Sequence, residues 1–185
     1  MSQTYQFPDR VRSFIARLRQ LEKRNDRGAL AALRRGASET TRHLAWPVVR
    51  QCGGDLRHPA WTAIGAAFAF YPQPEGSTDR ASNFGATCFA LADSTRNDGK
   101  SAFDSRFRRV LGSDSVDDLA KWIVQIAKRA KTAKPWPAPV NYEELLTAML
   151  FWDARDGALR ERIRRDWSTA YWQPGVLADD ESIQL

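Results

Sequence analysis

The sequence contains few of the residues that most often bind metals or carry out catalysis. It has two cysteines, Cys52 and Cys88, and two histidines, His43 and His58, among 185 residues. None of the four lies within two to four positions of another, which is the spacing that zinc motifs require. We interpret the thiols as core groups and the imidazoles as cap or surface groups, and we expect no metal and no cofactor. Two cysteines cannot form a disulfide framework, so we expect a reduced, cytoplasmic setting.

The motifs of common enzyme classes are also missing. The chain has no Gly-x-Ser-x-Gly sequence, and no Lys-Ser or Lys-Thr follows Gly53-Gly54 as a phosphate-binding loop would need. Asp117-Asp118 and Asp179-Asp180 are adjacent pairs, but neighbouring residues of a helix point about 100° apart. They therefore do not form a pair of carboxylates spaced for acid–base or metal chemistry. We predict that the protein is not an enzyme.

Long apolar runs are absent as well. The longest stretch covers residues 58–71, HPAWTAIGAAFAFY, and is shorter than the roughly 20 residues of a membrane-spanning helix. The N-terminal residues MSQTYQFPDR contain no apolar segment of the kind found in secretory signals. We expect no membrane association, and we expect residues 58–71 to form the most buried helix.

Helical periodicity runs through nearly all of the chain, and no segment alternates with the two-residue period of a strand. The fold class predicted is all-α, a compact helical bundle of about eight or nine helices. We expect a single helical domain over 8–172 and an acidic, mobile tail over 173–185. A division near the proline-rich residues 134–139 is an alternative. The expected helices cover 8–21, 26–36, 46–52, 58–71, 83–92, 103–111, 115–132, 141–152 and 157–172.

Two helix starts carry recognisable caps. Asp114-Ser115 precedes the helix over 115–132, whose first turn is acidic, as the positive end of a helix dipole favours. Asn141 is followed three residues later by Glu144, which predicts a reciprocal capping box at the start of the next helix.

Basic residues are the most informative feature. The chain has 28 Lys and Arg against 22 Asp and Glu, a net charge of +6, and 22 of the 28 are arginines. Between Lys100 and Lys134 there are nine basic and four acidic residues. On the helix over 115–132, Lys121 and Lys128 lie opposite an apolar stripe centred near Ile126. Few acids lie at the i,i+4 spacing that would neutralise these cations, so the surface fits contact with a nucleic-acid backbone. A solvated helix face is the alternative interpretation.

Three segments, taken in order, resemble one known family. They are Gly28–Gly36 (GALAALRRG), Phe103–Leu119 (FDSRFRRVL, then SD and DDL), and Asn141–Tyr171 (NYEELL, FWD, then Trp167 to Tyr171). Together they resemble the small, CasB-type subunit of the type I-E CRISPR Cascade complex. The resemblance covers most of residues 10–172, is weakest between about 58 and 98, and is absent in the tail.

The resemblance implies a non-enzymatic, all-helical subunit of an RNA-guided antiviral complex. Its expected partners are the other Cascade protein subunits, a second copy of itself along the belly of the complex, the guide RNA and the target DNA. Such subunits help to hold the guide–target duplex and the displaced DNA strand, and a separate helicase-nuclease cleaves the DNA.

The candidate nucleic-acid-binding residues come from two sources. The resemblance carries over to Arg34, Arg35, Arg57, Arg106, Arg109 and Arg155, whereas Lys121 and Lys128 are added from helix geometry. A different function stays open, that of a helical protein–protein adaptor whose basic face docks an acidic partner. A steep fall of nucleic-acid affinity with salt would exclude the adaptor.

Overall fold

The computed structural model describes residues 7–74, 81–94, 100–134, 137–155 and 157–173. These residues form nine α-helices and one 3₁₀ helix and no strand, which confirms the all-α prediction. None of the helices described is long and apolar enough to cross a membrane. The elements are α1 (Phe7–Lys23), α2 (Arg27–Arg35), η1 (Arg42–Ala45), α3 (Trp46–Gln51), α4 (Pro59–Phe70), α5 (Phe84–Ser94), α6 (Lys100–Leu111), α7 (Val116–Thr132), α8 (Tyr142–Trp152) and α9 (Gly157–Trp172).

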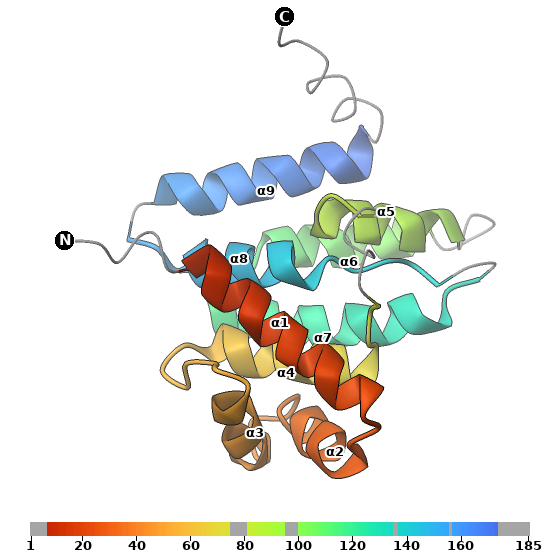
Figure 1. The fold of residues 1–185 in the computed structure, drawn as a ribbon. Coiled ribbons are helices and arrows are strands. Elements are labelled where there is room, and N and C mark those ends of the chain that lie inside the picture. Colours follow the sequence, from red (N-terminus) through yellow and green to blue (C-terminus); the bar gives the residue numbers. More distant parts are fainter. Residues whose placement is uncertain (1–6, 75–80, 95–99, 135–136, 156, 174–185) are drawn as a thin grey trace, which may run out of the picture.

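Helix α4 lies at the centre of the core, as its uniformly apolar sequence predicts. Every residue from Ala60 to Ala69 is buried. A helix that is apolar on all sides needs neighbours on all sides, and α1, α2, α7 and α8 pack around it. In Figure 1, α1 crosses in front of α4 and α7, and α9 runs across the top of the molecule.

The helices that follow the proline-rich residues 134–139 pack against helices that precede them. The hydroxyl of Tyr142 on α8 shares its one proton between the carbonyls of Ala67 and Tyr71, which lie 3.1 and 2.8 Å away. Trp167 on α9 packs against Phe84 of α5, with 5.3 Å between ring centroids. A single domain over 8–172 remains a prediction, and residues 174–185 of the predicted tail lie outside the described residues.

The two predicted caps have different outcomes. The Ser115 hydroxyl accepts a hydrogen bond from the backbone N–H of Asp118 at 3.2 Å, which confirms the cap of α7. Asn141 Oδ1 accepts from the backbone N–H of Glu144 at 3.1 Å, as expected. The reciprocal half of the capping box is wrong, because the Glu144 side chain turns into the protein and accepts from Trp167 Nε1 at 3.0 Å.

Candidate nucleic-acid interface

Helix α7 presents two of the predicted basic residues on its outer face. Leu119, Ile123 and Ile126 are buried on its inner face, and Lys121 and Lys128 are exposed. This is the arrangement that helix geometry predicts. The two lysines are seven positions apart, which corresponds to about 10 Å along the helix axis.

The C-terminal end of α4 brings two predicted residues together. Arg34 Nε, from α2, donates to the carbonyl of Ala69 at 2.9 Å. Lys128 Nζ, from α7, lies 3.9 Å from the centre of the Phe70 ring. Both contacts are favourable, because cations are stabilised near the negative end of a helix dipole and over aromatic faces. Arg35, the next residue along α2, is exposed.

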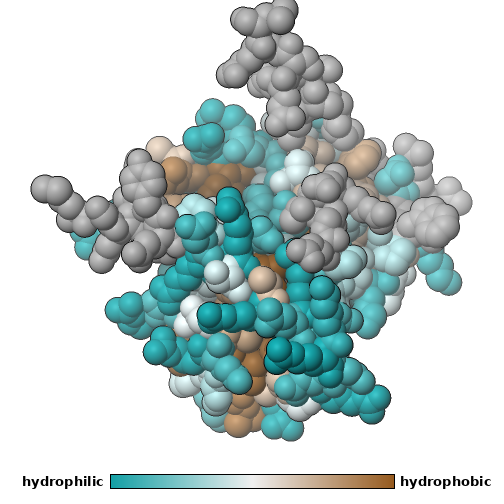
Figure 2. Space-filling view, in the orientation of Figure 1, coloured by the Kyte–Doolittle hydropathy of each residue, from teal (hydrophilic) through white to brown (hydrophobic). Residues whose placement is uncertain are grey.

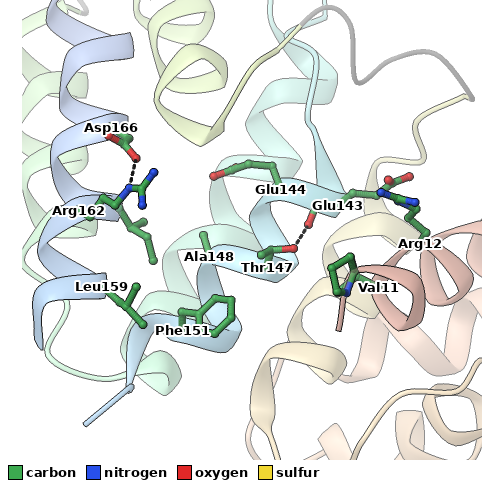
Figure 3. A pocket seen from close by; sticks show the side chains of 12 residues that line it. Val11, Arg12, Glu143, Glu144, Thr147, Ala148, Phe151, Leu159, Arg162 and Asp166 are labelled. Carbon is green, nitrogen blue, oxygen red and sulfur yellow. Dashed lines mark hydrogen bonds and ion pairs between the residues drawn. The ribbon is translucent and has the colours of Figure 1, made fainter. Parts of the chain in front are cut away.

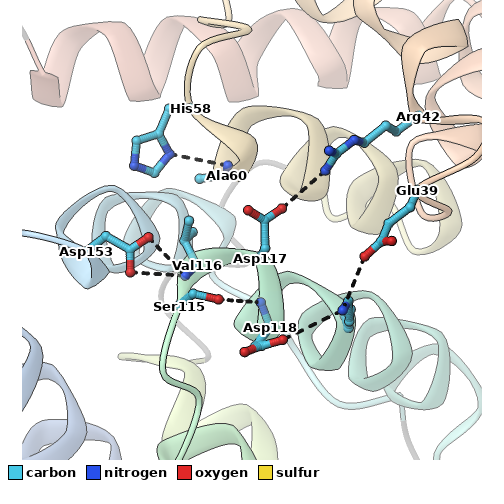
Figure 4. Close-up of polar contacts among 10 residues, drawn as sticks. Glu39, Arg42, His58, Ala60, Ser115, Val116, Asp117, Asp118 and Asp153 are labelled. Carbon is cyan, nitrogen blue, oxygen red and sulfur yellow. Dashed lines mark hydrogen bonds and ion pairs between the residues drawn. The ribbon is translucent and has the colours of Figure 1, made fainter.

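Lys121 is paired with two acids, and the sequence spacing indicates only one of them, Asp118, which lies three residues before it on the same helix. Its ammonium group lies 3.2 Å from Glu39 Oε1 and 3.7 Å from Asp118 Oδ1 (Figure 4). The hydrogen bond with Glu39, and then its charge, raise the pKa of Lys121. Glu39 comes from the segment between α2 and η1, so part of the positive charge of α7 is neutralised by a residue distant in sequence.

Arg109 on α6 lies beside α7, near Lys121. Its guanidinium carbon lies 6.0 Å from the centre of the Trp122 ring. Arg109 and Lys121 line a shared cavity of about 530 Å³, which Asp114 and Asp118 also line. Arg106, three residues before Arg109, is half-buried on α6.

Two of the predicted residues lie elsewhere. Arg57 forms a close ion pair with Asp55, at 2.8 Å, and its hydrogen bonds lower the pKa of that carboxyl to about 2. Arg155 is exposed in the turn between α8 and α9. The Asp153 carboxylate in that turn accepts from the backbone N–H of Val116, the first residue of α7. Arg155 therefore lies at the opposite end of α7 from Lys128.

Sequence reasoning missed one aromatic candidate. Periodicity places most of the tryptophans on core stripes, but Trp172 is 42% exposed at the end of α9. The guanidinium carbon of Arg108 lies 5.3 Å from its ring centre. An exposed ring beside a cation is a surface on which a nucleic-acid base can stack. The sequence gives a partial signal, because Trp172 follows Tyr171 in the last helix and neighbouring helical residues point about 100° apart.

The histidine and cysteine side chains take structural positions. His58 Nδ1 accepts from the backbone N–H of Ala60 at 3.3 Å and so caps α4, as predicted. Cys52 and Cys88 are buried. Among the described residues, no three His, Cys, Asp or Glu side chains are grouped closely enough to hold a metal ion.

Comparison with known proteins identifies the family. The model of the CRISPR-associated protein Cse2 matches residues 29–172. The chain belongs to the Cse2 family. It is therefore a CasB-type Cascade subunit, as the resemblance of its three segments implies.

Two solved structures have the same fold. The crystal structure of a Cse2-family CRISPR-associated protein from Thermus thermophilus is 20% identical, covers 88% of this chain and 97% of its own, and has a TM-score of 0.63. The crystal structure of M. ruber CasB is 18% identical, covers 95% of this chain and 98% of its own, and has a TM-score of 0.60. A search of curated proteins found no significant match.

Proposed function

We propose that this Cse2-family subunit is non-catalytic, pairs with a second copy of itself in Cascade, and holds the displaced DNA strand on the outer face of α7. The observation that carries the proposal is the set of basic side chains that three helices bring to this face. Arg34 and Lys128 meet at the end of α4, and Arg109 and Lys121 line one cavity. Arg35 extends the face along α2.

Contacts of this kind suit an RNA-guided complex. Replacing a DNA duplex with an RNA–DNA hybrid is nearly balanced in free energy, so contacts to the sugar–phosphate backbone can tip the exchange. Base pairing with the guide already supplies the sequence information. A rigid face of lysines and arginines that reads no base therefore suffices to stabilise the open strand.

The test uses the reconstituted complex with its guide RNA and the triple variant Arg35→Ala/Arg109→Ala/Lys128→Ala. Lys121 is kept, because replacing it would also release Glu39. We expect weaker binding of target DNA and fewer R-loops. A single-stranded phosphate contact contributes a slope of about 0.7 to the plot of log K against log salt. Loss of three contacts should therefore make the slope shallower by about 2.

The matched control is Arg24→Ala/Arg27→Ala/Arg50→Ala, which removes the same charge from exposed positions on or next to α1–α3. If both variants bind DNA equally well, the assignment of the α7 face is wrong. If neither variant changes the salt dependence of DNA binding by the complex, this subunit does not bind the phosphates, and the adaptor function is favoured. The pairing of Lys121 with Glu39 and of Arg42 with Asp117, both at 3.2 Å, is the observation that keeps the adaptor as a second candidate.

A further inference from the structure

A groove lies between α1, α8 and α9. Its volume is about 490 Å³, and its lining is mostly apolar. Two large side chains of its wall, Phe151 and Leu159, are 37% and 39% exposed. Figure 2 shows apolar surface along the lower edge of α9, and Figure 3 shows Phe151 and Leu159 next to each other at one end of the groove.

The opposite end of the groove contains a buried carboxyl group that is only half satisfied. Glu144 Oε1 accepts from Trp167 Nε1 at 3.0 Å. Glu144 Oε2 is inaccessible to solvent and has no hydrogen-bond partner among the described residues. A buried acceptor without a donor is destabilising, and more so when it is charged. Figure 3 shows this side chain reaching from α8 toward α9.

Carboxylates outnumber cations around the groove, although the chain as a whole has a charge of +6. Glu143, Glu144 and Asp166 border it, together with Arg12 and Arg162. Glu143 is paired with Arg19 at 3.2 Å, and Asp166 with Arg162 at 3.9 Å. Glu144 is the carboxylate that remains for an incoming donor.

We propose that this groove docks a segment of a different protein subunit, one that brings an apolar side chain to Phe151 and Leu159 and a lysine or arginine to Glu144. The apolar contact removes two large exposed side chains from water. The cation supplies the missing donor to Glu144 Oε2 after a small rotation of the carboxyl group. Nucleic acid fits poorly, because its phosphates would lie against an apolar wall and near the carboxylates of Glu143 and Asp166. This inference rests on the proposed function in one respect: the docked segment is taken to belong to another subunit of Cascade.

The experiment places a photocrosslinker in the groove of the complex reconstituted from defined subunits and guide RNA, without target DNA. Phe151→p-benzoylphenylalanine keeps an aromatic ring at the site. The matched control is Leu56→p-benzoylphenylalanine, also 37% exposed but lining a different cavity. We expect the Phe151 probe to crosslink to another protein subunit, at a peptide with a lysine or arginine close to an apolar residue. Adding Leu159→Asp should lower the yield at least tenfold, and adding Glu144→Gln several-fold.

Three outcomes would overturn the proposal: a yield no higher than at Leu56, a crosslink to nucleic acid, or a crosslink only to a second copy of this chain. Thermal melting of the isolated Leu159→Asp variant checks the fold, and an exposed position should tolerate the change. The α7 triple variant separates this proposal from the proposed function. This variant should keep the Phe151 crosslink and lose DNA affinity. If the crosslink persists and DNA affinity is unchanged, the proposed DNA-binding face on α7 is wrong and the docking groove is not affected.

Discussion

Burial raises the pKa of the Glu144 carboxyl to about 7, against an ordinary value of 4.5. The hydrogen bond from Trp167 lowers this pKa in part, as does the nearby backbone N–H of Phe84, and the negative charge of Asp166 raises it further. The folded protein therefore holds this proton more tightly than the unfolded chain does. The sign of the linkage follows: the contribution of Glu144 to stability is fully present below about pH 4.5 and is lost as the pH rises to about 7 and above.

We expect Glu144→Gln to remove the loss of stability at higher pH, because the amide stays neutral and its oxygen can still accept a hydrogen bond from Trp167. Each pKa unit corresponds to about 1.4 kcal/mol. The stability of the variant relative to the unmodified protein should therefore rise by about 2–3 kcal/mol between pH 4.5 and pH 8. Urea denaturation at several pH values measures the difference. Glu22→Gln, at an exposed position of α1, is the control. An equal stability difference at pH 4.5 and pH 8 would show that Glu144 does not titrate in this range.

Lys121 shows what can be learned about a single residue from the sequence alone. Its exposure follows from the apolar stripe of α7 itself, so helix periodicity predicts it. Its ion pair with Glu39 depends on how the segment after α2 packs beside α7, and residue spacing does not contain that information. The contact of Arg34 with Ala69 likewise depends on the crossing of α2 and α4. Sequence therefore identifies which cations face outward, and the fold decides which of them are neutralised.

At the scale of elements, the packing of α5 on α9 depends on one glycine. A Cβ added at Gly85 would overlap the backbone carbonyl group of Trp167. Backbone atoms of a packed helix cannot move aside as a flexible side chain can, so the two helices would have to separate. We expect Gly85→Ala to destabilise the protein by about 3 kcal/mol, at the upper end for overpacking.

Gly157→Ala is the matched control, because a Cβ at Gly157 would meet no atom within 4 Å. Alanine also restricts the unfolded chain, so this variant should be neutral or more stable by up to about 1 kcal/mol. Denaturant midpoints at constant m-value compare the two substitutions. If the Gly85→Ala and Gly157→Ala variants are equally stable, α5 and α9 can adjust to a Cβ at Gly85 at no cost in free energy of unfolding.

The helices themselves are largely predictable, and their pairing is not. The boundaries of α9 agree with the expected 157–172, because its glycine start and the proline after it punctuate the sequence. The connection before α3 has no clear apolar period, and it contains η1, Arg42–Ala45. The close contact at Gly85 and the groove beside Glu144 arise between helices far apart in the chain, so local patterns carry no signal for them.

At the scale of the whole molecule, the field that attracts a polyanion depends on where the +6 charge lies as well as on its size. Glu39 is 70% exposed and weakens the field at α7 through its pair with Lys121. We expect Glu39→Gln to strengthen binding of target DNA by the complex about threefold at low salt. A carboxylate and a DNA phosphate about 6 Å apart in water repel each other by roughly 0.7 kcal/mol, and removing this repulsion corresponds to a threefold gain in affinity. The gain should shrink above about 0.1 M salt, where the screening length falls below about 10 Å.

The control for this prediction is Glu22→Gln, which changes the net charge of the chain by the same amount at an exposed position of α1. Binding titrations of both complexes over a range of salt concentrations distinguish the physical cases. If the displaced strand lies on the α7 face, the Glu39 variant binds more tightly and the Glu22 variant does not, because screening confines the effect to nearby phosphates. If both variants gain equally, the subunit acts through its overall charge and the strand has no defined path on α7. If the Glu39 variant binds more weakly, Lys121 needs its partner for correct orientation, and the face is organised by its ion pairs.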